Sequence, residues 1–328
     1  MTGPKLSVAV ERWPIAGSFT ISRGSRTEAV VVVATITDGA HAGRGECVPY
    51  ARYGETVDGV VAAITAMAPA IAAGAGRTVI ADGMSPGAAR NAIDCALWDL
   101  EAKRAGKRVW ELAGLAAPTP VVTAYTLSLG SPEAMHEAAL AASDRPVLKV
   151  KLGGLGDPAR LAAVRRGAPK ALIIADANEA WTPEILDDCL AACRDTGVSL
   201  IEQPLPANAD AALDDRDRSI PICADESLHD RHHLAEVLKR YEVINIKLDK
   251  TGGLTEAIAL AKAAKAAGAG IMVGCMVGTS LAMAPAMCLT PGAAFVDLDG
   301  PLLLRTDRDP GLSFSGSQVS PPAAALWG

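Results

Sequence analysis

The sequence predicts an α/β protein in which a parallel barrel follows a smaller α+β domain. Its 328 residues exceed one small domain and suit a large barrel with a smaller partner. Beyond Pro118, short β-branched runs alternate with alanine-rich helical segments, which is typical of repeated βα units. The residues that end these runs recur every 22 to 28 positions, about the length of one βα unit in a barrel.

The first 115 residues favour strands followed by helices, as in an α+β domain. Residues 6–11 alternate in polarity and residues 29–37 form a β-branched run, so both are predicted strands. Two irregular loops are expected at residues 18–27 and 48–55, and the first of them carries Arg23 and Arg26. Helical spacing of apolar residues predicts helices from residue 57 to about 73 and over 86–105.

The composition excludes several classes of protein. A net charge of −6, a pI near 5.5 and no basic stripe argue against nucleic-acid binding. The apolar stretch at residues 29–36 is far too short to span a bilayer, and the opening residues do not predict a signal peptide. Seven scattered cysteines without a CxxC motif predict buried thiols in a reducing cytoplasm.

Charged or polar residues end the successive predicted strands of the barrel. If the first strand lies near Thr126, the later strands end at Lys151, Asp176, Glu202, Asp225, Lys247, Cys275 and Asp297. Active sites of barrels are built at the carboxyl ends of their strands, so these side chains are expected to converge there. The lysine pair then ends the second strand and Lys247 the sixth, which lie opposite each other in a ring of eight.

Three of these residues, Asp176, Glu202 and Asp225, suggest a metal site. They end the third, fourth and fifth strands, and carboxylate oxygens without nearby Cys or His suit Mg²⁺. The alternative is that each acid caps the helix that follows, which is common for one Asp at a strand-to-helix turn. Three acids on successive strands favour the metal site.

The lysines are the candidate acid and base groups. Lys149 and Lys151 are two residues apart on a strand, so both are expected to point into the barrel. A second ammonium nearby should lower the lysine pKa, which would make a usable base near neutral pH. The alternative is a solvated pair on an edge strand. Lys247 is a charge within an apolar strand, whereas Lys250 is expected to lie past the strand end and to be structural.

The KxK motif, then Asp, Glu and Asp on successive strands, then KxxKxGG from Lys247, resembles the muconate-lactonizing subgroup of the enolase superfamily. The resemblance covers nearly the whole chain. It implies that Asp176, Glu202 and Asp225 are metal ligands and that Lys151 and Lys247 are the two acid/base lysines.

The resemblance also implies an architecture. The expected fold is a modified (β/α)7β TIM-type barrel over residues 116–300, preceded by an α+β capping domain over residues 1–115. The tail, about residues 301–328, is expected to pack back on the capping domain. The two loops of that domain would close over the site and exclude water.

The last strand ends in Asp297 and Asp299, and this D-x-D resembles the dipeptide epimerases, among them the L-Ala-D/L-Glu epimerases. In that group the pair holds the substrate's α-ammonium, which suits two carboxylates on one face. Asp299 could instead cap the following turn. The group's pattern also implies substrate contacts, with Arg23 the first choice and Arg26 the second for a glutamate side chain. The other implied contacts are Thr126, Lys149, Cys275, Met276 and Val277.

The implied activity is the interconversion of L-Ala-D-Glu, a cell-wall peptide fragment, and L-Ala-L-Glu. Mg²⁺ would stabilise an enediolate while one lysine removes the α-proton and the other returns it from the opposite face. A lyase of the o-succinylbenzoate synthase or muconate cycloisomerase type, an N-acyl amino acid racemase and a catalytically silent binding protein are the alternatives. The expected partner is a small-molecule dipeptide, with no nucleic acid and no membrane, and assembly into a homo-oligomer stays open.

Overall fold

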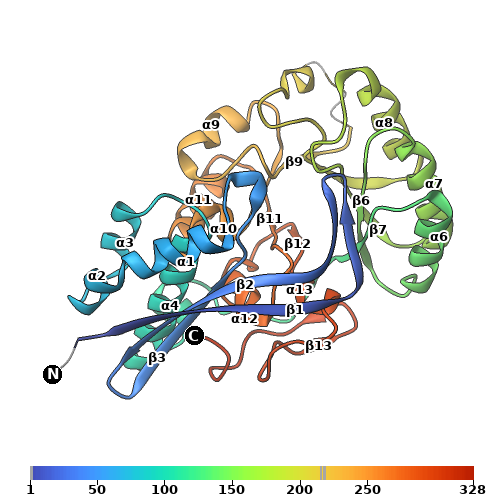
Figure 1. The fold of residues 1–328 in the computed structure, drawn as a ribbon. Coiled ribbons are helices and arrows are strands. Elements are labelled where there is room, and N and C mark those ends of the chain that lie inside the picture. The colour runs from blue at the N-terminus through green and yellow to red at the C-terminus, as the bar shows by residue number, and fades with distance from the viewer. Residues whose placement is uncertain (1–2, 215, 217–218) are drawn as a thin grey trace.

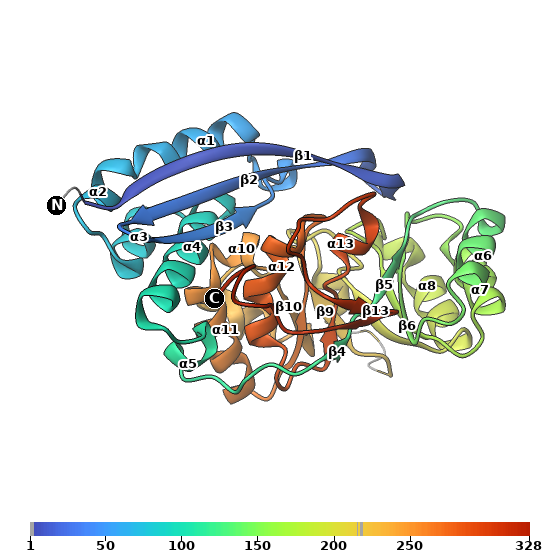
Figure 2. The same cartoon turned by 90° about the horizontal axis from the view of Figure 1, so that it is seen from below.

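The computed structural model describes residues 3–214, 216 and 219–328, and it contains two sheets that dominate the architecture (Figure 1). An antiparallel sheet belongs to the N-terminal region, and a curled parallel sheet of eight strands follows it. Figure 2 shows the N-terminal sheet and its helices covering one side of the barrel. The predicted α/β barrel with an α+β capping unit is thus confirmed.

The capping unit is a three-stranded sheet backed by helices. Its strands are β1 (Lys5–Ile21), β2 (Gly24–Asp38) and β3 (His41–Cys47), and its helices are α1 (Val57–Ala66), α2 (Ala68–Ala72), α3 (Arg77–Gly83), α4 (Ala88–Ala105) and α5 (Val109–Leu112). Helix α4 lies very close to β3, because a Cβ at Gly43 or Gly45 would meet helix backbone at about 2 Å. These glycines therefore allow helix and sheet to share one core.

Two predicted elements differ in detail from the structure. Residues 18–27, expected to be an irregular loop, form the end of the β1–β2 hairpin, whose pairing shifts register between Pro14 and Phe19. The polar side chains suggested a loop, yet the backbone hydrogen bonds of the hairpin continue to Ile21 and Gly24. The helix predicted from residue 57 to 73 breaks at Met67, because Pro69 lacks the amide proton needed to continue it.

The eight parallel strands follow chain order around the sheet. They are β5 (Tyr125–Leu127), β6 (Val147–Lys151), β7 (Leu172–Asp176), β8 (Val198–Glu202), β9 (Ile222–Ala224), β10 (Val243–Ile246), β11 (Gly270–Val273) and β12 (Phe295–Val296). The Ala124 amide donates to the Val296 carbonyl at 2.8 Å, so the first and last strands meet. The expected strand order is therefore correct, and β6 and β10 occupy the second and sixth places.

Helices and short 3-10 turns connect and cover these strands. The helices are α6 (Pro132–Ala141), α7 (Asp157–Gly167), α8 (Pro183–Asp195), α9 (Leu234–Val237), α10 (Leu248–Thr251), α11 (Leu254–Ala266), α12 (Ser280–Ala286) and α13 (Gly300–Leu303). The C-terminal tail adds β13 (Phe314–Ser315) and β14 (Gln318–Val319), which form a small sheet with β4 (Val121–Val122). At its end, the Trp327 indole donates to the Cys95 carbonyl of α4 at 3.1 Å.

Two predictions from composition can be compared with the structure. All seven cysteines are unpaired, and all except the half-buried Cys275 are buried. Within the described residues, no helix combines the length and apolar character that crossing a bilayer requires.

A buried ion-pair network joins the capping unit to the barrel. Glu46 of β3 is buried and accepts hydrogen bonds from the Thr279 amide at 2.8 Å and from the Thr279 hydroxyl at 2.5 Å. The Arg308 guanidinium lies 2.8 Å from Glu46 and 2.5 Å from Glu11 of β1. Burial raises the pKa of Glu46, and Arg308 opposes this rise by attracting the carboxylate. Arg308 therefore offsets the cost of a charge buried between the two units.

We expect Arg308→Met to lower the free energy of unfolding by about 3 kcal/mol, since removing one partner strands a buried carboxylate. Urea unfolding followed by tryptophan fluorescence would measure the change. Arg12→Met is the matched control, because Arg12 also pairs with a glutamate, Glu28, but both side chains are largely exposed. The control should lose less than about 1 kcal/mol. Equal losses in the two variants would contradict the role given to burial.

Candidate active site

The register of the parallel strands brings the predicted strand-end residues to one edge of the barrel. Lys151 at the end of β6 is level with Asp176 of β7, and Asp176 is level with Glu202 of β8. Asp225 and Lys247 follow directly after β9 and β10. All five side chains are buried, so their charges can be tolerated only because they lie beside opposite charges.

Lys149 lies at the centre of the acidic groups. Its ammonium is 2.7 Å from Asp297 Oδ2, 2.8 Å from Glu202 Oε2 and 3.2 Å from Asp176 Oδ2. Lys151, two residues further along the same strand, donates to Asp176 Oδ2 at 2.6 Å. Both side chains of the KxK motif thus point into the barrel, as the alternation of strand residues predicts.

The lysine of the sixth strand has its own carboxylate partner. Lys247 donates to Asp225 Oδ2 at 2.6 Å and lies 3.8 Å from Glu202 Oε1. Lys250 lies 2.7 Å from Asp225 Oδ1 and donates to the carbonyl oxygens of Asp225 and Asn245. These two main-chain contacts agree with the structural role that the sequence predicts for Lys250.

The lowered pKa expected for a lysine base beside a second ammonium stays a prediction, and the neighbouring Lys149 shows the opposite direction. Burial favours the neutral amine, but attraction to Asp297, Glu202 and Asp176 outweighs burial, so the pKa of Lys149 lies well above its usual range. The pKa of Lys247 is raised in the same way, against burial, chiefly by Asp225. The sequence showed the neighbouring lysine, but it did not show how many carboxylates approach each ammonium.

The three predicted metal ligands differ in pKa. Burial would raise all three values. The pKa of Asp176 is about 2, because attraction to Lys151 and Lys149 more than offsets the effect of burial. Lys247 and Lys250 hold the pKa of Asp225 well below its usual range. The pKa of Glu202 is raised, because burial and repulsion from Asp176 exceed the attraction of the lysines.

The donor set of Asp176, Glu202 and Asp225 suits a hard divalent cation, since it offers only carboxylate oxygens from successive strands. Within the described part of the chain, Glu202 Oε2 and Asp225 Oδ1 accept no hydrogen bond, and they lie 2.8 Å and 2.7 Å from the ammonium groups of Lys149 and Lys250. Among the described residues, no group of three acidic, histidine or cysteine side chains is placed to hold a metal ion as the side chains lie in this structure. Cations of the protein itself, the lysine ammonium groups, contact these oxygens, so the residues present fit a cation.

Asp297 and Asp299 form the acidic end of the pocket. Asp297 Oδ2 pairs with Lys149, whereas its buried Oδ1 has no hydrogen-bond partner among the residues that the structure describes. Asp299 Oδ2 accepts from the Thr126 amide at 2.6 Å, and its side chain does not cap α13, which begins at the next residue. Burial, together with repulsion from Asp297, raises the pKa of Asp299 to about 7. The alternative that Asp299 caps the following turn is therefore not what the structure shows.

One pocket lies over these charged groups, and most of the predicted site residues line it. It is lined by Thr126, Lys149, Lys151, Asp225, Lys247, Cys275, Met276, Val277, Asp297 and Asp299, together with residues of the β1–β2 hairpin, called the capping hairpin below. Asp176 and Glu202 lie below this surface and are fully buried. The pocket therefore has lysines from β6 and from the end of β10, and an acidic end at β12.

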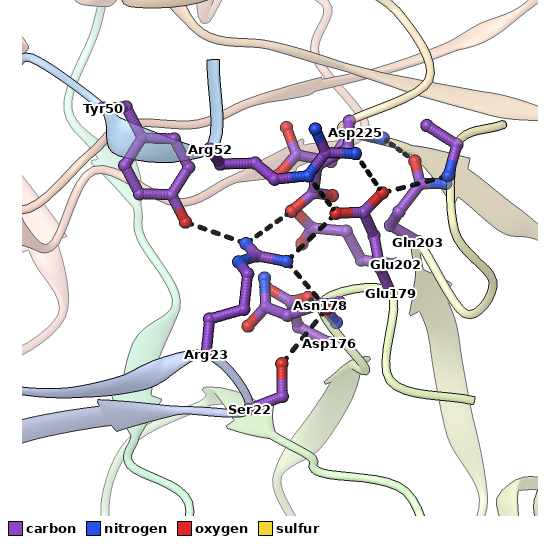
Figure 3. A network of polar contacts seen from close by, with 12 residues as sticks. Ser22, Arg23, Tyr50, Arg52, Asp176, Asn178, Glu179, Glu202, Gln203 and Asp225 are labelled. Atoms are coloured by element: carbon purple, nitrogen blue, oxygen red, sulfur yellow. Dashed lines mark hydrogen bonds and ion pairs between the residues drawn. The ribbon is translucent and has the colours of Figure 1, made fainter. Parts of the chain in front are cut away.

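The two candidate arginines of the hairpin have different surroundings. Arg23, at the tip, donates to Tyr50 at 2.8 Å, to the Asn178 carbonyl at 2.8 Å and to Glu226 at 2.7 Å (Figure 3). It is also 3.2 Å from Glu179, to which Arg52 of the second loop is bound through two nitrogens. Arg23 thus joins the tip of the hairpin to the barrel, and it does not line the pocket.

Arg26 lines the pocket, and its guanidinium lies 5.8 Å from the centre of the Tyr50 ring. Among the described residues, the side chain of Arg26 forms no hydrogen bond and no ion pair, although its backbone pairs with Phe19 in the hairpin. Its charge is therefore available to a ligand, in contrast to that of Arg23.

Sequence reasoning missed the polar residues that follow the strand ends. Asn178 and Glu179 follow Asp176, Gln203 follows Glu202, and Glu226 follows Asp225. Three of them, Asn178, Glu179 and Gln203, have positive φ angles of 45°, 66° and 35°, which is unusual outside glycine and frequent at functional sites. Burial and repulsion from Asp225 raise the pKa of Glu226 to about 7. The only feature of the sequence that could have identified these residues was their position next to the predicted metal ligands.

Two family models match the chain. Residues 5–114 match the mandelate racemase / muconate lactonizing enzyme N-terminal domain, and residues 133–324 match the enolase C-terminal domain-like family. The L-Ala-D/L-Glu epimerase of Escherichia coli (strain K12) is 45% identical over 96% of this chain and 98% of its own. The N-acetyl-D-glutamate racemase of Pseudoalteromonas sp is 44% identical over 91% of this chain and 95% of its own.

Solved structures are similar over the whole length. An enolase family member from Agrobacterium tumefaciens with homology to dipeptide epimerases, bound to sodium and L-Ala-L-Glu, has a TM-score of 0.97 and 54% identity, covering 99% of this chain and all of that chain. A dipeptide epimerase from Enterococcus faecalis V583, complexed with Mg and L-Leu-L-Tyr, has a TM-score of 0.91 and 29% identity, covering 100% and 99%. The chain therefore belongs to the mandelate racemase/muconate lactonizing enzyme family of the enolase superfamily, as its strand-end motifs predicted.

Proposed function

We propose that this protein is a dipeptide epimerase that interconverts L-Ala-D-Glu and L-Ala-L-Glu by moving the α-proton of the glutamate residue. The observation that carries the proposal is that Lys151 and Lys247 line one pocket from the second and sixth strands of the barrel. Two amines on opposite sides of one carbon can remove a proton from one face and return another to the other face. The names of the similar epimerases support the same reaction.

Asp176, Glu202 and Asp225 would hold Mg²⁺, as their carboxylate oxygens fit a hard cation and a related epimerase is complexed with Mg. When bound, Mg²⁺ would supply positive charge where negative charge builds on the substrate carboxylate as the α-proton leaves. Lys151 and Lys247 would act as the base and the acid, one on each face of the α-carbon. Lys149 remains charged between Asp297 and Glu202 and orients both carboxylates.

The two ends of the pocket recognise the two ends of the substrate. The free Oδ1 of Asp297, with Asp299 beside it, accepts hydrogen bonds from the α-ammonium of the alanine residue. Arg26, without an ion-pair partner among the described residues, binds the side-chain carboxylate of the glutamate residue. N-acyl amino acids and the anionic substrates of the lyase alternatives have no ammonium for the acidic end.

Proton NMR in D₂O with Mg²⁺ and L-Ala-D-Glu tests the reaction. The glutamate α-proton signal should disappear while L-Ala-L-Glu forms. Lys151→Ala and Lys247→Ala should each reduce epimerisation by about a thousandfold or more, since each removes the acid or base for one face. Lys170→Ala, which changes an exposed lysine outside the pocket, is the matched control and should leave the rate unchanged. Full epimerisation by either pocket variant would contradict the two-lysine mechanism.

Asp297→Asn tests recognition of the ammonium. We expect kcat/KM for L-Ala-D-Glu to fall about 10- to 100-fold, because a charge-assisted hydrogen bond in a buried pocket is lost. Rates with N-acetyl-D-glutamate, measured in parallel, separate the dipeptide epimerase from the racemase alternative. Wild-type turnover of the acetylated amino acid above that of the dipeptide would favour the racemase and overturn the assignment of the acidic end.

Arg26→Gln tests recognition of the glutamate side chain. It should raise KM for L-Ala-D-Glu at least about tenfold and should affect a dipeptide with an uncharged C-terminal side chain much less, because only the glutamate presents a second carboxylate. Arg23→Gln is the comparison, and it should slow both dipeptides to a similar degree, since it weakens the contact between hairpin and barrel. If only Arg23→Gln raised KM selectively for L-Ala-D-Glu, Arg23 and not Arg26 would be the residue that binds the glutamate side chain.

A further inference from the structure

A second cleft lies directly beside the pocket, and a thin wall of side chains separates the two. Ile15, Phe19, Thr126 and Leu303 line both cavities. The pocket contains about 870 Å³ of empty space and the cleft about 1040 Å³, both including space open to solvent. The cleft continues between the capping hairpin and α6. The space behind the wall is thus of similar size to the pocket in front of it.

The wall is built where β1 leaves its regular pairing with β2. The register shifts between Pro14 and Phe19, and Gly17 within this segment has a φ of 91°. Ile15 instead forms a bridge with Leu304, and the Arg305 amide donates to the Pro14 carbonyl at 2.8 Å. This irregularity brings β1 against α13, as both views of the fold show (Figures 1 and 2). Bulges of this kind often re-aim side chains beside active sites.

The wall adjoins the acidic end of the pocket. Asp299 immediately precedes α13, and Leu303 is the last residue of that helix. Thr126, whose amide is bound to Asp299, belongs to the wall as well. Ile15 and Leu303 line the same pocket as Asp297 and Asp299, so the side chain of a residue whose ammonium binds to this acidic pair would lie near the wall.

We propose that Ile15 and Leu303 limit the size of the N-terminal residue of the dipeptide, and that the cleft behind them accepts a larger residue once the wall is cut back. The inference rests on the proposed function, because it takes Asp297 and Asp299 as the ammonium site. The intact wall selects dipeptides with a small N-terminal side chain. Phe19 is less suited to a test, because the Lys151 ammonium lies 5.7 Å from the centre of its ring.

Leu303→Ala and Ile15→Ala test the proposal by exchange of the glutamate α-proton in D₂O, with L-Ala-D-Glu and L-Leu-D-Glu compared. We expect the wild-type protein to favour L-Ala-D-Glu. Either variant should shift the ratio of the two kcat/KM values toward L-Leu-D-Glu by at least about tenfold, since one methylene in an apolar pocket changes selectivity by about 10- to 200-fold. Leu303→Val removes less volume and should shift the ratio in the same direction if the alanine variant fails to fold.

Leu302→Ala is the matched control. Leu302 precedes Leu303 in α13, is also half-buried, and lines the cleft but not the pocket. Its truncation should enlarge the cleft and leave the ratio unchanged. If the wild type exchanges L-Ala-D-Glu normally but the Ile15 and Leu303 variants show unchanged ratios, the proposed role of the wall is wrong and the proposed function still stands. Absence of exchange with every dipeptide in the wild type would instead overturn the proposed function.

Discussion

The structure depends on balanced charge within the barrel mouth. Lys149 contacts three carboxylates at once, and neither it nor its partners could be buried alone, because an unpaired charge in the interior costs several kcal/mol. The balance requires the in-register ends of β6, β7 and β8, since a shift of one residue would turn the lysines away from the acids. The parallel barrel supplies this alignment.

Much of the fold was predictable because periodic patterns report on burial. The β-branched runs and their even spacing identified the strands of the barrel, and the order of β6 through β10 followed from chain order alone. The hairpin was less visible, because an exposed polar hairpin and a polar loop have similar compositions. The break at Met67 was missed because the helical spacing of apolar residues continues past it, although Pro69 marks it.

The candidate site was predictable to the extent that strand ends converge. Sequence spacing was enough to bring Lys151, Asp176 and Glu202 together, but it could not reveal which groups would surround each charge. The pKa of Lys149 is the clearest example, because its direction depends on three carboxylates from three other strands. The contrast between Arg23 and Arg26, three residues apart on one hairpin, likewise depends on contacts with the barrel that no local pattern encodes.

The bulge in β1 has a consequence for how such proteins can diverge. The groups suited to proton transfer lie at the ends of barrel strands, whereas Ile15 and Leu303 of the wall belong to the hairpin and to α13, which lie before and after the barrel strands in the chain. Substitutions at these two residues leave the strands that carry the lysines and their carboxylate partners unchanged. With the proposed role of the wall, selectivity for the peptide and proton transfer are encoded in separate segments of this chain, so single substitutions can change one of them at a time.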